Sequence, residues 1–113
     1  MTRALLVRTT GAYIIEVEPN LEGIRNAIGG GWLEGVSSSI DDDWHAYCDE
    51  EGKLKGLPPN LAATMLLHSL GWPKGDILHG HVIIFGERKV EEGVDEADVP
   101  DRVLALARSM GLL

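Results

Sequence analysis

Cysteine and aromatic residues are scarce in this chain, which has one cysteine, Cys48, and only 5% aromatic residues among its 113 residues. A single cysteine excludes an internal disulfide and favours a reducing compartment. Near the N-terminus, Arg3 and Arg8 enclose only four apolar residues. That run is too short for a signal segment or a membrane span. We therefore expect a cytoplasmic protein that does not enter a membrane.

Positive charge is also scarce, because the chain has 10 Lys and Arg residues and 18 Asp and Glu residues, which give a formal net charge of −8. Binding to the phosphates of a nucleic acid requires a basic face, so the composition argues against a nucleic-acid partner. Many of the acidic residues fall in two runs, at 41–51 and 91–101. Such runs are commonly solvated loops, but an acidic surface also steers association with a basic protein.

Apolar periodicity and turn residues predict strands and helices in mixed order. Asn20 and Asn60 are placed to cap helices over 21–28 and 61–70. Strands are expected at 3–9, 13–18, 32–36, 44–49, 53–57 and 77–85, the last with a bulge at Gly80. We predict an α+β fold, in which an antiparallel or mixed sheet of about five to six strands carries three helices.

The length predicts a single domain over residues 1–113. Within it we expect an α+β core at 1–90, an acidic linker at 91–98 and a C-terminal helix at 99–111. Asp98 is the expected N-cap of that last helix, since a short acidic side chain can accept hydrogen bonds from its first turn.

Residues with reactive or metal-binding side chains show no catalytic pattern. His79 and His81 flank Gly80, but zinc needs three or four ligands, and the other His, Cys and Asp residues lack ligand spacing. We therefore predict no metal and no cofactor. Cys48 is expected to be a small buried thiol. Because no nucleophile, base and orienting group converge, the sequence does not favour an enzyme.

The segment DEEGKLKGLPPN, residues 49–60, precedes the helix expected at 61–70. The first turn of a helix has free N–H groups at the positive end of its dipole, and such a site attracts anions. Lys53 and Lys55 lie close by in the sequence. This pattern predicts a candidate anion site made of Lys53, Lys55, Asn60 and Leu61, although Asn60 itself competes for the same N–H groups.

Three tryptophans lie at the ends of expected elements rather than within them. Packing at the edge of the core explains such positions, and so does a binding surface. One of them directly follows three aspartates. The candidate partner-binding surface is therefore Asp41, Asp42, Asp43 and Trp44.

Two stretches of the sequence are similar to a known family. The run YCDEEGKLKGLPPNLAAT, which begins at Tyr47, and the later run GDILHGHVIIFG resemble a small family of phages, plasmids and bacterial chromosomes, domain of unknown function three-eight-four-six (DUF3846). The resemblance extends from about Leu5 to Gly86 and leaves most of the C-terminal helix outside. It brings no catalytic residues, and it implies a phage or mobile-element accessory protein.

Two functional hypotheses follow from these observations. The first is a non-catalytic protein that binds a host or phage protein, as an inhibitor or an anti-defence factor. The alternative is a small-ligand or nucleotide-binding module whose anion site lies at the N-terminus of the 61–70 helix. The oligomeric state stays open, with a homodimer of two-fold symmetry as the commonest arrangement for a small domain.

Overall fold

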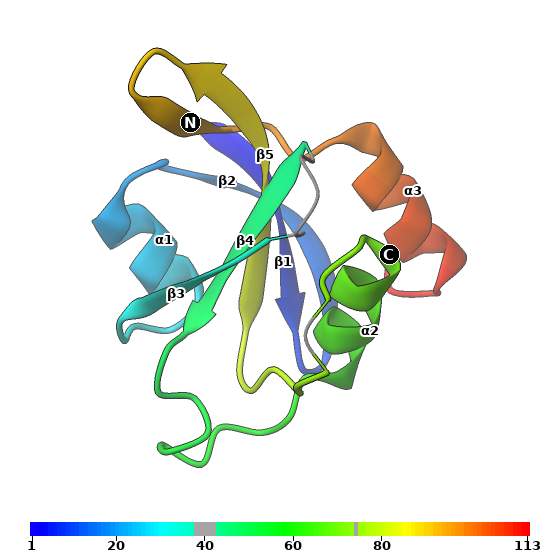
Figure 1. The fold of residues 1–113 in the computed structure, drawn as a ribbon. Coiled ribbons are helices and arrows are strands. Elements are labelled where there is room, and N and C mark those ends of the chain that lie inside the picture. The colour runs from blue at the N-terminus through cyan, green and yellow to red at the C-terminus, as the bar shows by residue number, and fades with distance from the viewer. Residues whose placement is uncertain (38–42, 74) are drawn as a thin grey trace.

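Six antiparallel strands form one sheet that carries three helices in the computed structural model, which describes residues 1–37, 43–73 and 75–113 (Figure 1). The predicted α+β fold is confirmed. The strands are β1 (Thr2–Arg8), β2 (Gly11–Val17), β3 (Leu33–Val36), β4 (Trp44–Asp49), β5 (Val82–Val90) and β6 (Gly93–Ala97), and the helices are α1 (Leu21–Ala27), α2 (Leu61–Ser69) and α3 (Asp101–Ser109).

Strand β5 lies at the centre of the sheet, whose order is β2-β1-β5-β4-β3, with β6 paired to the far half of β5. The first four side chains of β5 are fully buried, and they alternate between two cores. Val82 and Ile84 point to the face covered by α2 and α3, whereas Ile83 and Phe85 point to the face covered by α1 (Figure 1). Apolar residues on both faces are typical of a central strand, as the sequence predicted.

The two cores differ in size. The larger one joins the sheet to α2 and α3 through Leu5, Val7, Trp44, Leu66, Leu67 and Val103, among others. The smaller one joins the sheet to α1 through Ala4, Leu6, Ile24, Ile28, Ile83 and Phe85. Burying one such aliphatic side chain stabilises the fold by about 1.5–3 kcal/mol. None of the described helices is long and apolar enough to cross a bilayer.

Two of the three expected helix caps are confirmed. The side chain of Asn20 accepts a hydrogen bond from the Gly23 N–H at 2.8 Å, and that of Asn60 accepts one from the Ala63 N–H at 3.0 Å. The prediction for Asp98 was wrong. Its carboxylate accepts a hydrogen bond from the Arg3 N–H at 2.8 Å and so fastens the start of β1, while α3 begins after Pro100 without a side-chain cap.

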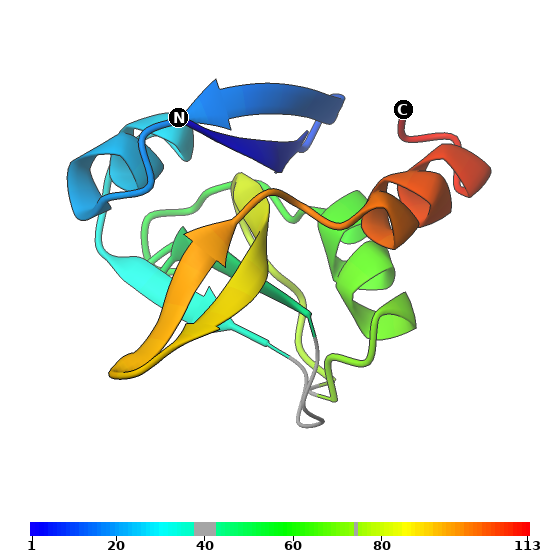
Figure 2. The same ribbon diagram turned by 90° about the horizontal axis from the view of Figure 1, so that it is seen from above.

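The acidic stretch 91–98 is not a linker, because Gly93–Ala97 pairs with Gly86–Val90 as strand β6. The β5–β6 hairpin projects from the body of the molecule as an arm (Figure 2). Glu91 and Glu92 occupy its exposed turn, where a run of like charges is fully solvated. A charge run therefore does not by itself exclude pairing when water reaches its side chains.

The strand predicted at 53–57 does not form, and the one predicted at 77–85 begins later. Residues 53–56 lie in consecutive turns, closed by hydrogen bonds from the Lys55 N–H to Glu51 O at 2.9 Å and from the Gly56 N–H to Lys53 O at 3.1 Å. The reason is that β3 already pairs with the edge of β4 that this segment would need. The strand expected at 77–85 begins at Val82, since Gly80 has a φ of +83° that interrupts an extended chain.

Asn60 is almost completely buried, with 1% of its surface exposed. Besides capping α2, its Nδ2 donates to the carbonyl oxygens of Val7 at 2.9 Å and of Gly80 at 2.8 Å. Its backbone N–H donates to Leu78 O at 2.8 Å. One amide side chain thus joins a helix, the central sheet and the segment that leads into β5.

We expect Asn60→Ala to lower the free energy of unfolding by about 2–4 kcal/mol, because it removes a cap and two buried hydrogen bonds from the Asn60 amide to backbone carbonyl groups. The matched control is Asn20→Ala, which removes only the exposed cap of α1 and is expected to cost about 1 kcal/mol. Urea unfolding of both variants measures the difference. Equal losses in the two variants would show that the buried donor bonds contribute nothing.

Candidate functional site

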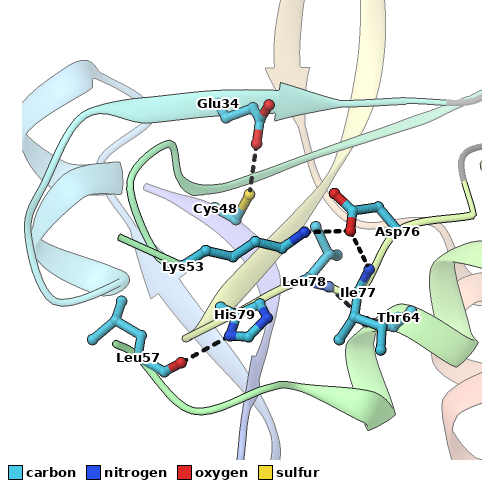
Figure 3. Close-up of polar contacts among 9 residues, drawn as sticks. All are labelled: Glu34, Cys48, Lys53, Leu57, Thr64, Asp76, Ile77, Leu78 and His79. Carbon is cyan, nitrogen blue, oxygen red and sulfur yellow. Dashed lines mark hydrogen bonds and ion pairs between the residues drawn. The ribbon is translucent and has the colours of Figure 1, made fainter. Parts of the chain in front are cut away.

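The loop between β4 and α2 closes over one end of the β3–β4 pair and leaves a hollow of 330 Å³. A second hollow of 260 Å³ shares Glu34, Asp76 and Leu78 with the first. Together they form a continuous depression along β3, which we call the β3 groove. Figure 3 shows its walls, with Glu34 and Cys48 from β3 and β4 on one side and the 76–79 segment on the other.

Among the described residues of the β3 groove, carboxylates outnumber cations. The larger hollow is lined by the carboxylates of Glu34, Asp49, Glu50 and Asp76 and, within the same part of the chain, by one lysine, Lys53. The Lys53 ammonium donates to the Asp76 carboxylate across the groove (Figure 3). This hydrogen bond, with a second from the Ile77 N–H, holds the pKa of Asp76 below its usual value. The groove therefore favours a positively charged occupant.

The structure does not bring the predicted anion site together. The Asn60 side chain already accepts the hydrogen bond of the Ala63 N–H in the first turn of α2. Lys53 pairs with Asp76, and the Lys55 ammonium lies 2.7 Å from an Asp49 carboxylate oxygen. Leu61 presents only an exposed apolar side chain beside the cap. Proximity to Asn60 in the sequence was a poor guide, because Lys53 pairs with Asp76 of a distant segment and Lys55 pairs with Asp49 at the end of β4.

Asp49 is buried at the end of β4 and holds the loop in place. Burial by itself raises the pKa of this carboxyl group. Hydrogen bonds from Lys55 and from the Glu51 N–H, and the Lys55 charge, act in the opposite direction and hold the pKa below its usual value. The folded protein thus favours the ionised form of Asp49.

Cys48 is a buried thiol, as predicted, with 2% of its surface exposed. Burial raises its pKa to about 12, and the nearby charge and hydrogen-bonding contact of Glu34 act in the same direction. The thiol donates weakly to a Glu34 carboxylate oxygen at 3.7 Å (Figure 3). A thiol that stays protonated at neutral pH is a poor nucleophile, so the groove is not organised around cysteine chemistry.

The two histidines that flank Gly80 point to different places. His79 lines the β3 groove, where its Nδ1 lies 2.9 Å from Leu57 O and therefore donates a hydrogen bond to that carbonyl oxygen. His81 lines a separate hollow beside Pro58. Among residues 1–37, 43–73 and 75–113, no group of three or more His, Cys, Asp or Glu side chains is placed to hold a metal ion.

The two described residues of the predicted partner-binding surface, Asp43 and Trp44, both contact other parts of the fold. Trp44 is a core residue with 1% of its surface exposed, and its indole N–H donates to Leu70 O at 3.2 Å. Asp43 pairs with Arg102 of α3, whereas Asp41 and Asp42 lie outside the described residues. Trp72 is also buried, so Trp32 is the one exposed tryptophan of the three.

Sequence reasoning missed two features of the site. Leu54 is 88% exposed at the tip of the loop and Ile77 is 44% exposed on the opposite rim. In the strand predicted at 53–57, Leu54 would have pointed to the face opposite Lys53 and Lys55. The alternation of charged and apolar residues carried no signal that would have separated a turn from a strand.

A second polar cluster lies on the opposite face of the sheet. The two ring nitrogens of His45 each lie 3.2 Å from a carboxylate oxygen, one of Glu87 and one of Glu96. The Tyr47 hydroxyl donates to Glu96 at 2.6 Å, and burial together with Glu96 raises the pKa of Tyr47. The cluster fastens the β5–β6 arm to β4.

We expect the Cys48 thiol of the native protein to react with a disulfide-exchange reagent at mildly alkaline pH far more slowly than the same thiol after unfolding. The reason is its burial and its pKa of about 12. Glu34→Gln removes a negative charge next to the sulfur and should increase the native rate. A native rate equal to that of the unfolded chain would contradict a buried, protonated thiol.

The Asp49–Lys55 pair predicts a loss of stability in acid. Because the pKa of Asp49 is lower in the folded state, its stabilising contribution is present above the unfolded pKa and disappears as the pH falls through the folded pKa. Lys55→Met should weaken this dependence and reduce stability at neutral pH by about 1–3 kcal/mol. The control is Lys53→Met, whose pair with Asp76 is exposed and screened by solvent, so that its loss is expected to change stability less.

The measurement is urea unfolding of the three proteins from neutral pH to about pH 3, below the ordinary range of aspartate. If Lys55→Met and Lys53→Met showed the same pH profile, the buried pair would not be the source of the acid sensitivity.

Comparison with known proteins places the chain in a family but assigns it no activity. The model of DUF3846, a domain of unknown function, matches residues 1–108. The match includes most of α3, which the sequence resemblance had left outside. No curated protein and no solved structure matches the chain. Because the match spans nearly the whole sequence, the chain belongs to the DUF3846 family.

Proposed function

We propose that this protein is a non-catalytic binding protein that holds a basic segment of a partner protein in the β3 groove. The observation that carries the proposal is an acidic groove with exposed apolar side chains on its rims. Leu54 and Ile77 supply the rims. The carboxylates of Glu34 and Glu50 supply acceptors for a Lys or Arg side chain.

The charge of the groove favours this kind of partner. Among the described residues, four carboxylates and one ammonium, that of Lys53, line the larger hollow, and the whole chain carries a formal net charge of −8. Complementary charge accelerates the encounter of two proteins and fixes their orientation. A guanidinium group entering the groove would meet carboxylates that no lysine of the described chain neutralises, such as Glu50.

The apolar rims favour a protein partner over a free cation. Protein interfaces combine apolar contacts at the centre with a polar periphery. Leu54 stands at the tip of the loop with 88% of its surface exposed, and a partner surface that covers it would remove this apolar area from water. A small ion would leave both rims exposed.

The polar groups of the groove do not favour the other candidate functions. A protonated thiol and a histidine bound to a backbone carbonyl do not form a nucleophile and base pair. An excess of carboxylates disfavours a nucleotide or another anion. The resemblance implies a phage or mobile-element setting, so the partner we propose is a host or phage protein, and the role an inhibitor or anti-defence factor.

The test is affinity capture from a host lysate, followed by the native mass of any complex. The informative variant is Glu34→Lys with Glu50→Lys, which reverses the groove charge. The matched control is Glu91→Lys with Glu92→Lys, which makes the same change of charge at the exposed tip of the arm. We expect a stoichiometric complex that survives the control and weakens at least about tenfold in the groove variant.

A third variant, Leu54→Ser, separates apolar contact from charge. Its side chain makes little contact with the fold, so thermal unfolding should be unchanged while the complex weakens. Equal loss of binding in the groove variant and the arm control would indicate general electrostatic attraction and would overturn the proposal. Unchanged binding in the groove variant would overturn it as well.

A further inference from the structure

Strand β2 forms one edge of the sheet and, among the strands of residues 1–37, 43–73 and 75–113, pairs with β1 on only one side. Figure 2 shows β2 at a margin of the molecule, with no helix or strand drawn beyond it. The strand is seven residues long and its register with β1 is continuous from Gly11 to Val17. Native edges are usually protected by a short strand, a lysine, a proline or a bulge. Strand β2 has none of these, whereas the other end of the sheet is the four-residue β3.

The hairpin geometry shows which backbone groups of β2 point outward. Its loop has two residues, so Arg8 and Gly11 are a hydrogen-bonded pair, and such pairs alternate along the ladder. The N–H and C=O groups of Gly11, Tyr13, Ile15 and Val17 therefore face β1. Those of Ala12, Ile14 and Glu16 face the open edge, and within the described part of the chain no backbone hydrogen bond outside the strand ladders uses them.

The opposite edge of β1 agrees with this alternation. The carbonyl oxygens of Arg3 and Val7 point away from β2, because they accept hydrogen bonds from the Val99 N–H at 2.9 Å and from Asn60 Nδ2 at 2.9 Å. Odd positions of β1 thus face β5, and even positions face β2. Because even positions of β1 pair with odd positions of β2, the even positions of β2 point outward.

We propose that β2 pairs antiparallel with β2 of a second copy of this chain, around a two-fold axis at Ile14. This register places Ile14 opposite Ile14 of the second copy, and Ala12 opposite Glu16. All three outward positions then form hydrogen-bonded pairs, and the two sheets become one. A two-fold contact between identical edges is self-complementary and closes after two chains.

The side chains suit this register on both faces of the sheet. Ile14 is 42% exposed and would pack against its own copy, while Tyr13, which is 47% exposed, would lie opposite Ile15. Aromatic and β-branched pairs across strands are stabilising. Glu16 is the only charged residue of β2, and it faces an alanine, so no like charges are opposed. The net charge of each chain, −8, weakens the dimer at low salt.

Native mass, measured by sedimentation across a dilution series at physiological and higher salt, is the first test. We expect a dimer at high concentration that dissociates on dilution. Ile14→Lys and Ile14→Glu should each give a monomer, because each sets like charges against each other at the two-fold axis. Mixing the two variants should restore a dimer, since the introduced lysine then faces the introduced glutamate.

The control is Val94→Lys in β6, where a valine is similarly exposed at 51%, and it should stay dimeric. A third variant, Ile14→Pro, removes the outward N–H but no hydrogen bond of the β1 ladder, so the fold should persist without the dimer. A wild-type protein that is monomeric at all concentrations overturns the proposal. So does a dimer that survives Ile14→Lys, or a mixture of the two charged variants that stays monomeric.

Discussion

The buried side chain of Asn60 links three parts of this protein through hydrogen bonds. It caps α2, donates to the β1 carbonyl of Val7 and donates to Gly80 just before β5. The Gly80 N–H donates a hydrogen bond to Pro58 O at 2.8 Å. These contacts fix where α2 begins and where the chain turns into the central strand. The loop that precedes Asn60 is held between β4 and this corner, and that loop builds the β3 groove.

The central strand β5 divides the molecule into two halves with different roles. Its alternating side chains fill a larger core under α2 and α3 and a smaller core under α1. On the larger side, the sheet ends in the acidic groove. On the smaller side, the cluster of His45, Glu87 and Glu96 fastens the projecting arm. Each face of the sheet thus combines a dry core with a polar margin where water reaches the strand ends.

Local chemistry made several parts of the fold predictable. Asparagine before an apolar helical stripe identified the starts of α1 and α2, because a cap involves groups only three residues apart. A run that is apolar on both faces identified β5 as central. The arm was missed because pairing of β6 depends on a partner strand, and acidic residues gave the appearance of a solvated linker. The candidate site was the least predictable part, since Lys53 pairs with Asp76, 23 residues away.

The sequence alone determined the α+β class, the helix caps, the central strand and the buried state of Cys48, because these depend on neighbouring residues and on hydrophobic periodicity. The segment DEEGKLKGLPPN also marked the corner before α2. Only the tertiary structure decided which lysine meets which carboxylate, that Trp44 is buried and that Leu54 is exposed. Those outcomes depend on which segments distant in the sequence become neighbours, and that is set by strand order, which no local pattern encodes.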